Sequence, residues 1–315
     1  MPDAFDRLAK PVGSVQASLR VVTAHELLAM ELPPRETILA PWLPQKGLAM
    51  IYGPRGIGKT HITLGAAYAI ATGGAFLRWK ADKPRRVLIL DGEMPTVTLQ
   101  ERLATIVSAA ANEPPASDFL RLLPIDLQER GLDLGAEPDQ LDLAPYLDGV
   151  DVIFVDNIST LARAGRENEA ESWLPVQEWA LEQRRAGRSV VFIHHAGKGG
   201  LQRGTSRRED VLDTVIALRK PADHAADQGA RFEVHFEKNR GFHGDDAKPF
   251  EAALGAGGWT TRDLADADMA RVVVLTGVGM SVREIAEETG FTKSRVSRLQ
   301  AKARETGLME AAGHG

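Results

Sequence analysis

Four short apolar runs alternate along the chain with longer segments of helical character. The runs span residues 48–52, 87–90, 150–155 and 190–193. Apart from Asp151, each is continuously apolar rather than alternating, which is typical of strands buried on both faces of a parallel sheet. The helical segments span residues 61–72, 96–111 and 169–185. They are long enough to connect parallel strands, so the pattern predicts an α/β fold with a mostly parallel sheet covered by helices.

The pattern changes after residue 210. From residue 231 to 237, the apolar residues Phe232, Val234 and Phe236 alternate with polar ones, which is typical of a strand with one face in water. We therefore expect residues 211–261 to extend the sheet with antiparallel strands.

The C-terminal segment has the pattern of two short helices. Ser281 and Glu284 have the spacing of a capping box, which starts a helix, and Gly290 interrupts it before a second helix from about Thr292. The segment resembles helix-turn-helix proteins, on the spacing of Ala286, Gly290, Val296 and Leu299. For 315 residues, about two domains are expected besides a loose arm. The predicted parts are an N-terminal arm at 1–35, an α/β domain at 36–262 and a small all-α helix-turn-helix domain at 263–315.

Composition excludes several classes of protein. The chain is 43% hydrophobic and 26% charged, as in ordinary globular proteins, and has no cysteine, which excludes disulfides, thiolate zinc sites and a cysteine nucleophile. Neither a signal peptide nor an apolar stretch of about 20 residues is visible, so we expect no membrane role and a cytoplasmic location. The net charge of -5 argues against general coating of nucleic acid but allows a local basic face.

A glycine-rich segment after the first apolar run predicts a phosphate site. The segment is Gly53, Pro54, Arg55, Gly56, Ile57, Gly58, Lys59 and Thr60. It matches the Walker A pattern, and it lies between an expected strand and an expected helix, as that motif requires. Lys59 would reach the terminal phosphates of ATP, and the Thr60 hydroxyl would bind Mg²⁺. The alternative is an ordinary glycine-rich turn.

Two carboxylates are expected near this loop, because both follow buried strands. Asp156 directly follows the third apolar run and is a Walker-B-type candidate for Mg²⁺, or else a cap of the next turn. Glu93 follows the second run and is placed to polarise the water that attacks the γ-phosphate. Asp91 competes with Glu93 for this role, and Glu93 as a solvated loop residue remains an alternative.

Five segments in this order resemble the RecA-like ATPase core, and within it the DnaB-like and RepA-type hexameric helicases. They are GPRGIGKT at 53–60, Glu93-Met94, IFVDNIS at 153–159, FIHHAGKG at 192–199 and Lys238-Asn239-Arg240-Gly241. The resemblance covers residues 36–255. It implies a homo-hexameric ring with ATP between subunits, Glu93 as catalytic base and His195 as a sensor of the γ-phosphate.

Arg240 is a candidate for a residue that acts on the ATP of a neighbouring subunit, since a guanidinium neutralises charge on a transferring phosphoryl group. Lys238 is a second candidate, and a solvated basic hairpin is the alternative for both. His194 and His195 would point to opposite faces of a strand without an acidic cluster, which argues against a metal site. For His195, a packed and hydrogen-bonded histidine is the alternative to the sensor.

Two basic segments are candidates for DNA binding. Residues 196–208 carry Lys198, Arg203, Arg207 and Arg208, and the resemblance implies that this loop lines the ring channel and contacts single-stranded DNA. A solvated surface loop is the alternative. Residues 292–304 carry no acidic residue, so the second predicted helix is a candidate for duplex DNA, or else for protein docking. Its basic residues are Lys293, Arg295, Arg298, Lys302 and Arg304.

These residues together predict an ATP- and Mg²⁺-dependent DNA motor, with a hexameric helicase of plasmid or mobile-element replication as the first hypothesis. The second is a DNA-binding regulator or maintenance factor whose ATPase controls assembly. A nucleotide-binding scaffold without turnover is the third.

Overall fold

A computed structural model describes residues 19–162, 170–196, 210–221, 223–225 and 228–309. The chain divides into two units, Met1–Arg35 and Glu36–Gly315. In the first unit, Thr23 and Glu26 form a capping box for α1 (Ala24–Ala29), a six-residue helix with no buried residue. None of the helices in the described ranges is long and apolar enough to cross a membrane.

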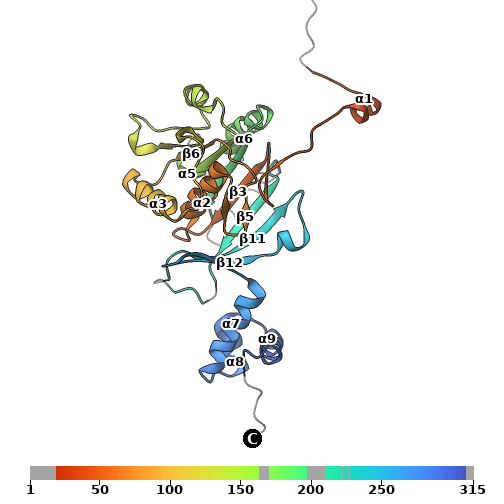
Figure 1. The fold of residues 1–315 in the computed structure, drawn as a ribbon, viewed down its shortest axis with the longest axis vertical. Helices are drawn as coiled ribbons and strands as arrows, with labels where there is room; N and C mark the ends of the chain where they lie inside the picture. The colour runs from red at the N-terminus through yellow and green to blue at the C-terminus, as the bar shows by residue number, and fades with distance from the viewer. Residues whose placement is uncertain (1–18, 163–169, 197–209, 222, 226–227, 310–315) are drawn as a thin grey trace, which may run out of the picture. The chain divides into compact units, whose positions relative to one another are not determined.

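The second unit is built around a nine-stranded sheet (Figure 1). Six neighbouring strands are parallel. In spatial order they are β7 (Leu120–Pro124), β6 (Val87–Asp91), β8 (Val152–Asp156), β9 (Ser189–His195), β3 (Leu48–Gly53) and β10 (Thr214–Arg219). The antiparallel strands that follow are β11 (Arg231–Asn239), β12 (Phe250–Gly255) and β13 (Gly258–Asp263). The predicted α/β fold with a mostly parallel sheet is thus confirmed.

Two strands differ from the prediction. β10 lies within the expected antiparallel segment 211–261, but it pairs in parallel with β3, so the antiparallel extension begins only at β11. Its residues Thr214 to Leu218 are buried, as expected of a strand covered on both faces. β7 was not predicted, because it is an edge strand whose residues are mostly half-buried and include Arg121.

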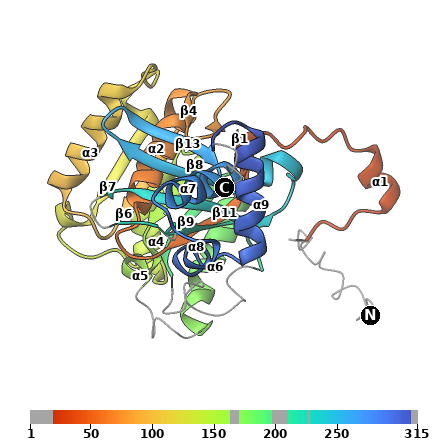
Figure 2. The ribbon, with the colours of Figure 1, turned by 90° about the horizontal axis from the view of Figure 1, so that it is seen from below.

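Helices cover both faces of the parallel part of the sheet (Figure 2). On β3, Ala49 and Ile51 belong to one apolar core and Met50 and Tyr52 to the other, because successive side chains of a strand point to opposite faces. The first core contains residues of α2 (Lys59–Thr72) and α3 (Thr96–Ala109). The second contains residues of α4 (Glu137–Leu143), α5 (Ile158–Leu161) and α6 (Ala170–Arg185).

Two small hairpins pack against the first core. They are formed by β1 (Thr37–Leu39) with β2 (Leu43–Pro44), and by β4 (Ala75–Phe76) with β5 (Trp79–Lys80). Trp42 and Trp79 join them through an edge contact with ring centroids 5.2 Å apart. Gly65 of α2 allows Phe76 to approach, since a Cβ at this position would lie 2.2 Å from the ring.

Three helices end the chain, α7 (Leu264–Gly277), α8 (Val282–Thr289) and α9 (Lys293–Glu305). Ser281 and Glu284 form the predicted capping box of α8, and Gly290 follows that helix with φ 70°. A small core of Val272, Ile285 and Val296 holds the three helices together.

A buried network of charged side chains joins α7 to the antiparallel strands. Glu251 of β12 is 2% exposed and accepts hydrogen bonds from Arg231, Arg262 and Arg271. Burial alone would raise the pKa of Glu251, but hydrogen bonds from Arg231 and Arg262 lower it. Asp268 of α7 contacts Arg271 and pairs with Arg295 of α9, which carries the network into the last helix.

Candidate nucleotide site

The Walker A segment forms the turn between β3 and α2. Ile57 is 1% exposed and fixes the middle of the turn in the first apolar core. Gly58 has φ 109°, a conformation that residues with a side chain rarely adopt, and an added Cβ would lie 3.2 Å from the Cβ of Ala230. The turn therefore presents its backbone N–H groups at the start of α2, where a helix N-terminus attracts anions.

Lys59 is held inside this turn. Its Nζ donates to the carbonyl oxygens of Gly53 at 3.1 Å and Pro54 at 2.9 Å. Burial lowers its pKa, and the charges of Asp156 and Glu93 act against this. The ammonium group can exchange its carbonyl partners for phosphate oxygens, which carry the opposite charge.

Asp156 ends β8 beside the P-loop. It is 3% exposed, and burial together with the charge of Asp91 raises its pKa to about 7. Its Oδ2 has no hydrogen-bond partner among the described residues. A buried, unpaired carboxylate oxygen fits a bound cation, so Asp156 and the half-buried Thr60 are the residues that would hold Mg²⁺.

The loop after β6 separates the roles of Asp91 and Glu93. Asp91 Oδ1 accepts from the backbone N–H groups of Glu93 at 3.2 Å and Met94 at 2.8 Å, so this carboxylate stabilises the turn. Burial raises its pKa. The Glu93 side chain is 53% exposed and therefore accessible to water. Of the two competing carboxylates, the geometry favours Glu93 as the base.

Gly92 brings this loop close to β8. Its N–H donates to the carbonyl oxygen of Asp156 at 2.7 Å, and a Cβ at Gly92 would lie 2.4 Å from Thr160 Oγ1. Asp91 and Asp156 are also register partners in neighbouring strands. The two loops therefore bring Glu93 and Asp156 to the same edge of the sheet.

His195 ends β9 and completes the cluster. Its backbone pairs in register with Gly53, and its Nε2 lies 3.4 Å from Glu93 Oε2. Burial lowers its pKa, and the charge of Lys59 adds to this. Its Nδ1 is buried and has no hydrogen-bond partner among the described residues. The neighbouring His194 is fully buried in the strand.

Asn157 was not singled out by sequence reasoning. Its side-chain Nδ2 donates to Glu93 and lies 3.3 Å from His195 Nε2. The available signal was its position directly after Asp156, since polar residues at the carboxyl ends of parallel strands face the ligand site.

Arg240 lies near the amino ends of the parallel strands, whereas the P-loop of its own chain lies at their carboxyl ends. Arg240 follows Asn239, which pairs with Thr214, and Thr214 pairs with Ala49 near the start of β3. The P-loop begins at Gly53, at the other end of β3, about 13 Å further along the strand at about 3.3 Å per residue. Arg240 is exposed and lies farther from this P-loop than an arginine side chain extends. Lys238, in register with Val215, is half-buried on the same part of β11.

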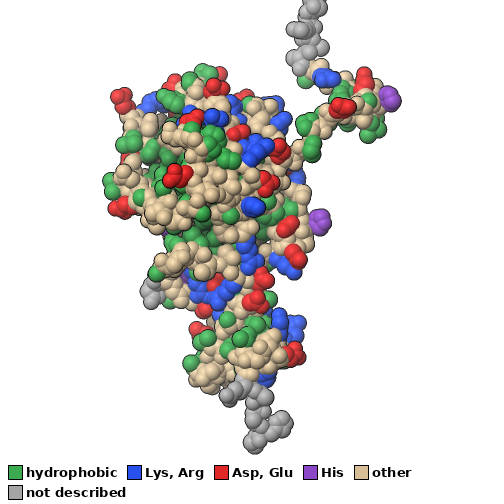
Figure 3. Space-filling model, viewed as in Figure 1, with side chains coloured by type: hydrophobic (Ala, Val, Ile, Leu, Met, Phe, Trp, Pro, Cys, Tyr) green, Lys and Arg blue, Asp and Glu red, His purple; other side chains and the backbone are tan. Residues whose placement is uncertain are grey.

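Of the two basic segments, the structure describes α9 but not the basic residues of the loop before β10. Lys198, Arg203, Arg207 and Arg208 lie outside the described residues. Lys293 and Arg298 are exposed on α9, and Lys and Arg side chains are visible over this helix in Figure 3. Arg295 differs from them, because it pairs with Asp268 and its guanidinium carbon lies 4.3 Å from the ring centroid of Phe291.

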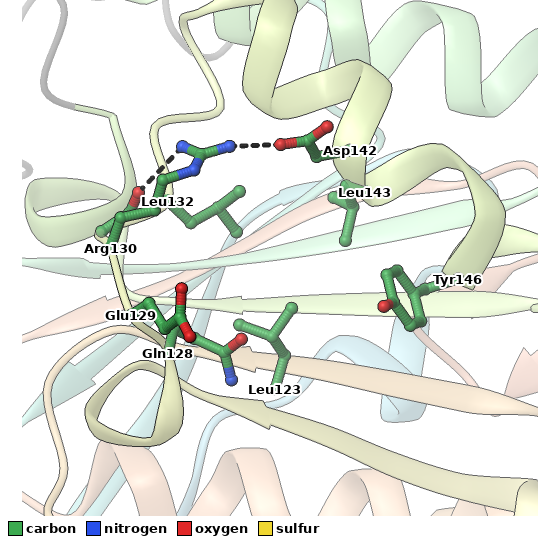
Figure 4. A pocket seen from close by; sticks show the side chains of 9 residues that line it. Leu123, Gln128, Glu129, Arg130, Leu132, Asp142, Leu143 and Tyr146 are labelled. Atoms are coloured by element: carbon green, nitrogen blue, oxygen red, sulfur yellow. Dashed lines mark hydrogen bonds and ion pairs between the residues drawn. The ribbon is translucent and has the colours of Figure 1, made fainter.

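A separate cavity of about 610 Å³ is lined by residues of β7, of α4 and of the segment 128–132 (Figure 4). Its lining includes Leu123, Tyr146 and Arg130. The Arg130 guanidinium is neutralised by Asp139 and Asp142, so this cavity offers no unpaired positive charge to a phosphate. None of the nucleotide-site residues lines it.

Comparison with known proteins identifies the class. Residues 14–200 match the model of a family described as an AAA domain, which is more than half of the chain. The protein therefore belongs to this family of P-loop ATPases. Among solved structures, it is similar to a KaiC-like protein from the hyperthermophilic archaeon Pyrococcus horikoshii OT3, with 14% identity and a TM-score of 0.48. That similarity covers 70% of this chain and 90% of the archaeal one. No curated protein matches the sequence.

Proposed function

We propose that this P-loop ATPase hydrolyses ATP to drive a DNA motor, and that it works as a hexameric helicase in plasmid or mobile-element replication. The observation that carries the proposal is the convergence at one sheet edge of Lys59, Asp156, Glu93 and His195. These residues come from the ends of β8 and β9, the loop after β6 and the start of α2.

The arrangement suits attack of water on the γ-phosphate of ATP. Glu93 takes a proton from the water, whose oxygen forms a bond to phosphorus while the bond to the bridging oxygen of ADP breaks. Lys59 neutralises charge on the transferred group, and His195 contacts it from β9. Mg²⁺, when bound by Thr60 and Asp156, would add charge neutralisation at the phosphates.

Assembly into a ring is supported by the position of Arg240. Its distance from the P-loop of its own chain leaves a neighbouring subunit as the place where this guanidinium could meet a γ-phosphate. Lys238, near the end of β11, could act there as a second positive charge.

Contact with DNA is supported by the basic surface of α9. Lys293 and Arg298 are exposed, and we propose that α8 and α9 act as a helix-turn-helix that binds duplex DNA. The loop with Lys198, Arg203, Arg207 and Arg208 would contact single-stranded DNA in the ring.

The second candidate is an ATP-controlled DNA-binding regulator or maintenance factor without strand separation. The observation that favours it is the network from Glu251 through Arg271 and Asp268 to Arg295, because it connects the sheet directly to α9. Through such a connection, nucleotide state could change how α9 binds DNA.

Phosphate release from Mg-ATP, with and without single-stranded DNA, tests the first proposal. We expect hydrolysis that rises with DNA, together with displacement of a strand from a forked duplex. ATPase activity without any displacement would favour the regulator, and absence of hydrolysis would contradict both.

Duplex binding tests the role of α9. A double variant, Lys293→Ala with Arg298→Ala, should bind duplex DNA more weakly and with a smaller salt dependence, since fewer counterions are released. Lys248→Ala is the control, since Lys248 is exposed and pairs with Asp245 on a separate loop. Unchanged duplex affinity in the double variant would assign α9 to protein docking.

A further inference from the structure

The side-chain amide of Asn157 lies between two residues of the nucleotide site. Asn157 is 1% exposed, and its Nδ2 donates to Glu93 Oε2 while lying 3.3 Å from His195 Nε2. No step of the hydrolysis described above uses this amide.

The orientation of the amide follows from the chemistry of its neighbours. An ionised carboxylate only accepts hydrogen bonds, so the atom that faces Glu93 has to be Nδ2, which carries two N–H groups, and not Oδ1. The same nitrogen faces His195 Nε2. Nδ2 lies 3.3 Å from Nε2, slightly closer than Glu93 Oε2 at 3.4 Å. Nδ2 cannot accept, so in the tautomer that uses this contact Nε2 is the acceptor and the neutral imidazole of His195 carries its proton on Nδ1, whereas in the other tautomer Nε2–H would donate to Glu93.

The free side of the imidazole then becomes a donor. His195 is only 7% exposed, and its Nδ1 is buried without a hydrogen-bond partner among the described residues. A buried N–H without a partner is costly, so an acceptor that reaches Nδ1 when a ligand is bound would stabilise this tautomer.

The backbone of Asn157 is held firmly enough to fix this geometry. Its carbonyl oxygen accepts from Leu161 N at 3.2 Å, from Thr160 N at 3.3 Å and from Thr160 Oγ1 at 3.0 Å. Asn157 directly precedes α5 and directly follows Asp156, so the amide is tied to the strand end that carries the proposed Mg²⁺ ligand.

We propose that Asn157 is a positioning residue, whose one amide group orients the Glu93 carboxylate and fixes His195 in the tautomer that donates from Nδ1. The proposal rests on the proposed ATP hydrolysis and specifies how its base and its phosphate sensor are held relative to each other. Replacement of the amide by a carboxylate of the same shape would put an acceptor against Glu93 and remove the donor to His195.

The test compares Asn157→Asp with the wild type in steady-state phosphate release. We expect kcat to fall about tenfold to a hundredfold, as for a misplaced catalytic group, with KM for Mg-ATP nearly unchanged. Gln183→Glu is the matched control, because Gln183 is also a buried amide in the same domain but contacts Arg188. It should hydrolyse ATP like the wild type. A wild-type kcat in Asn157→Asp, or a raised KM with kcat unchanged, would overturn the proposal.

A second comparison separates positioning from simple loss of packing. In a His195→Gln background, Asn157→Asp should lower kcat by less than it does in the wild type, because part of its effect passes through His195. If the double variant instead loses kcat by the product of the two single fold-changes, the two residues act independently and the proposal that Asn157 acts through His195 is contradicted.

The tautomer can be measured directly in the folded full-length protein. Nitrogen NMR on protein labelled at histidine should show His195 protonated at Nδ1, with the signal assigned by its loss in His195→Gln. Protonation at Nε2 would overturn the proposal regardless of how the variants fold. A wild type that releases no phosphate would contradict the proposed function instead, which keeps the two failures distinct.

Discussion

The sheet carries two clusters of buried polar groups that differ in how they are paired. At the carboxyl edge, Asp156 Oδ2, Asn157 Oδ1 and His195 Nδ1 are buried without a hydrogen-bond partner among the described residues. In the antiparallel extension, by contrast, the equally buried Glu251 accepts from three arginines.

The electrostatics of the two clusters differ in the same sense. Burial and Asp91 raise the pKa of Asp156 to about 7, whereas hydrogen bonds from Arg231 and Arg262 outweigh burial and lower the pKa of Glu251. An unpaired buried polar group costs about 1–3 kcal/mol, so it persists where a ligand completes the pairing. The first cluster is therefore arranged for a ligand, and the second joins parts of the structure.

Lys59→Ala should have the largest effect on the first cluster. It removes a phosphate contact in both the ground state and the transition state, so ATP binding weakens and turnover falls about a thousandfold. Nucleotide titration and phosphate release measure the two effects. Hydrolysis close to that of the wild type would show that this edge of the sheet is not where ATP is hydrolysed.

Arg240→Ala should also reduce turnover about a thousandfold, as for an arginine supplied in trans, but leave ATP binding unchanged. Rings mixed from Arg240→Ala and Lys59→Ala subunits should regain some activity, because some interfaces then combine an intact arginine with an intact P-loop. Absence of rescue in rings shown to be mixed would count against action across an interface.

Glu251→Gln tests the second cluster. It leaves the buried arginines without their shared carboxylate, so we expect a loss of about 3–5 kcal/mol in the free energy of unfolding, measured with denaturant. Glu287→Gln is the control, because Glu287 forms an exposed pair with Arg283 that is worth about 0.5 kcal/mol at most. Similar effects of the two substitutions would show that the network does not stabilise the fold.

The raised pKa of Asp156 predicts a smaller effect that depends on pH. The folded state binds the carboxyl proton of Asp156 more tightly than the unfolded chain does. The stability that this protonation contributes is therefore present at low pH and is lost as pH rises from about 4 to about 7. The side chain in Asp156→Asn does not ionise, so the variant does not lose this stability as pH rises. Without nucleotide, the variant should be more stable than the wild type above pH 7, and the difference should shrink towards pH 4. A difference independent of pH would contradict a raised pKa.

The contrast between the clusters also explains what the sequence could predict. The apolar runs and the segment from Gly53 to Thr60 carry local signals, so they predicted four parallel strands and the position of the P-loop. The roles of Asp91 and Glu93 depend on one hydrogen-bonded turn and could not be separated from the sequence. Asn157 and the network around Glu251 depend on pairing between distant strands, which no local pattern records.

Hydrolysis and binding by Glu93→Gln test the central claim most directly, which is that the unpaired cluster at the carboxyl edge is a catalytic site with Glu93 as its base. The substitution keeps the shape of the side chain and removes the carboxylate that accepts the proton. We predict that Glu93→Gln binds Mg-ATP as tightly as the wild type and releases phosphate at least about a hundredfold more slowly. Turnover at the wild-type rate with unchanged binding would contradict this account.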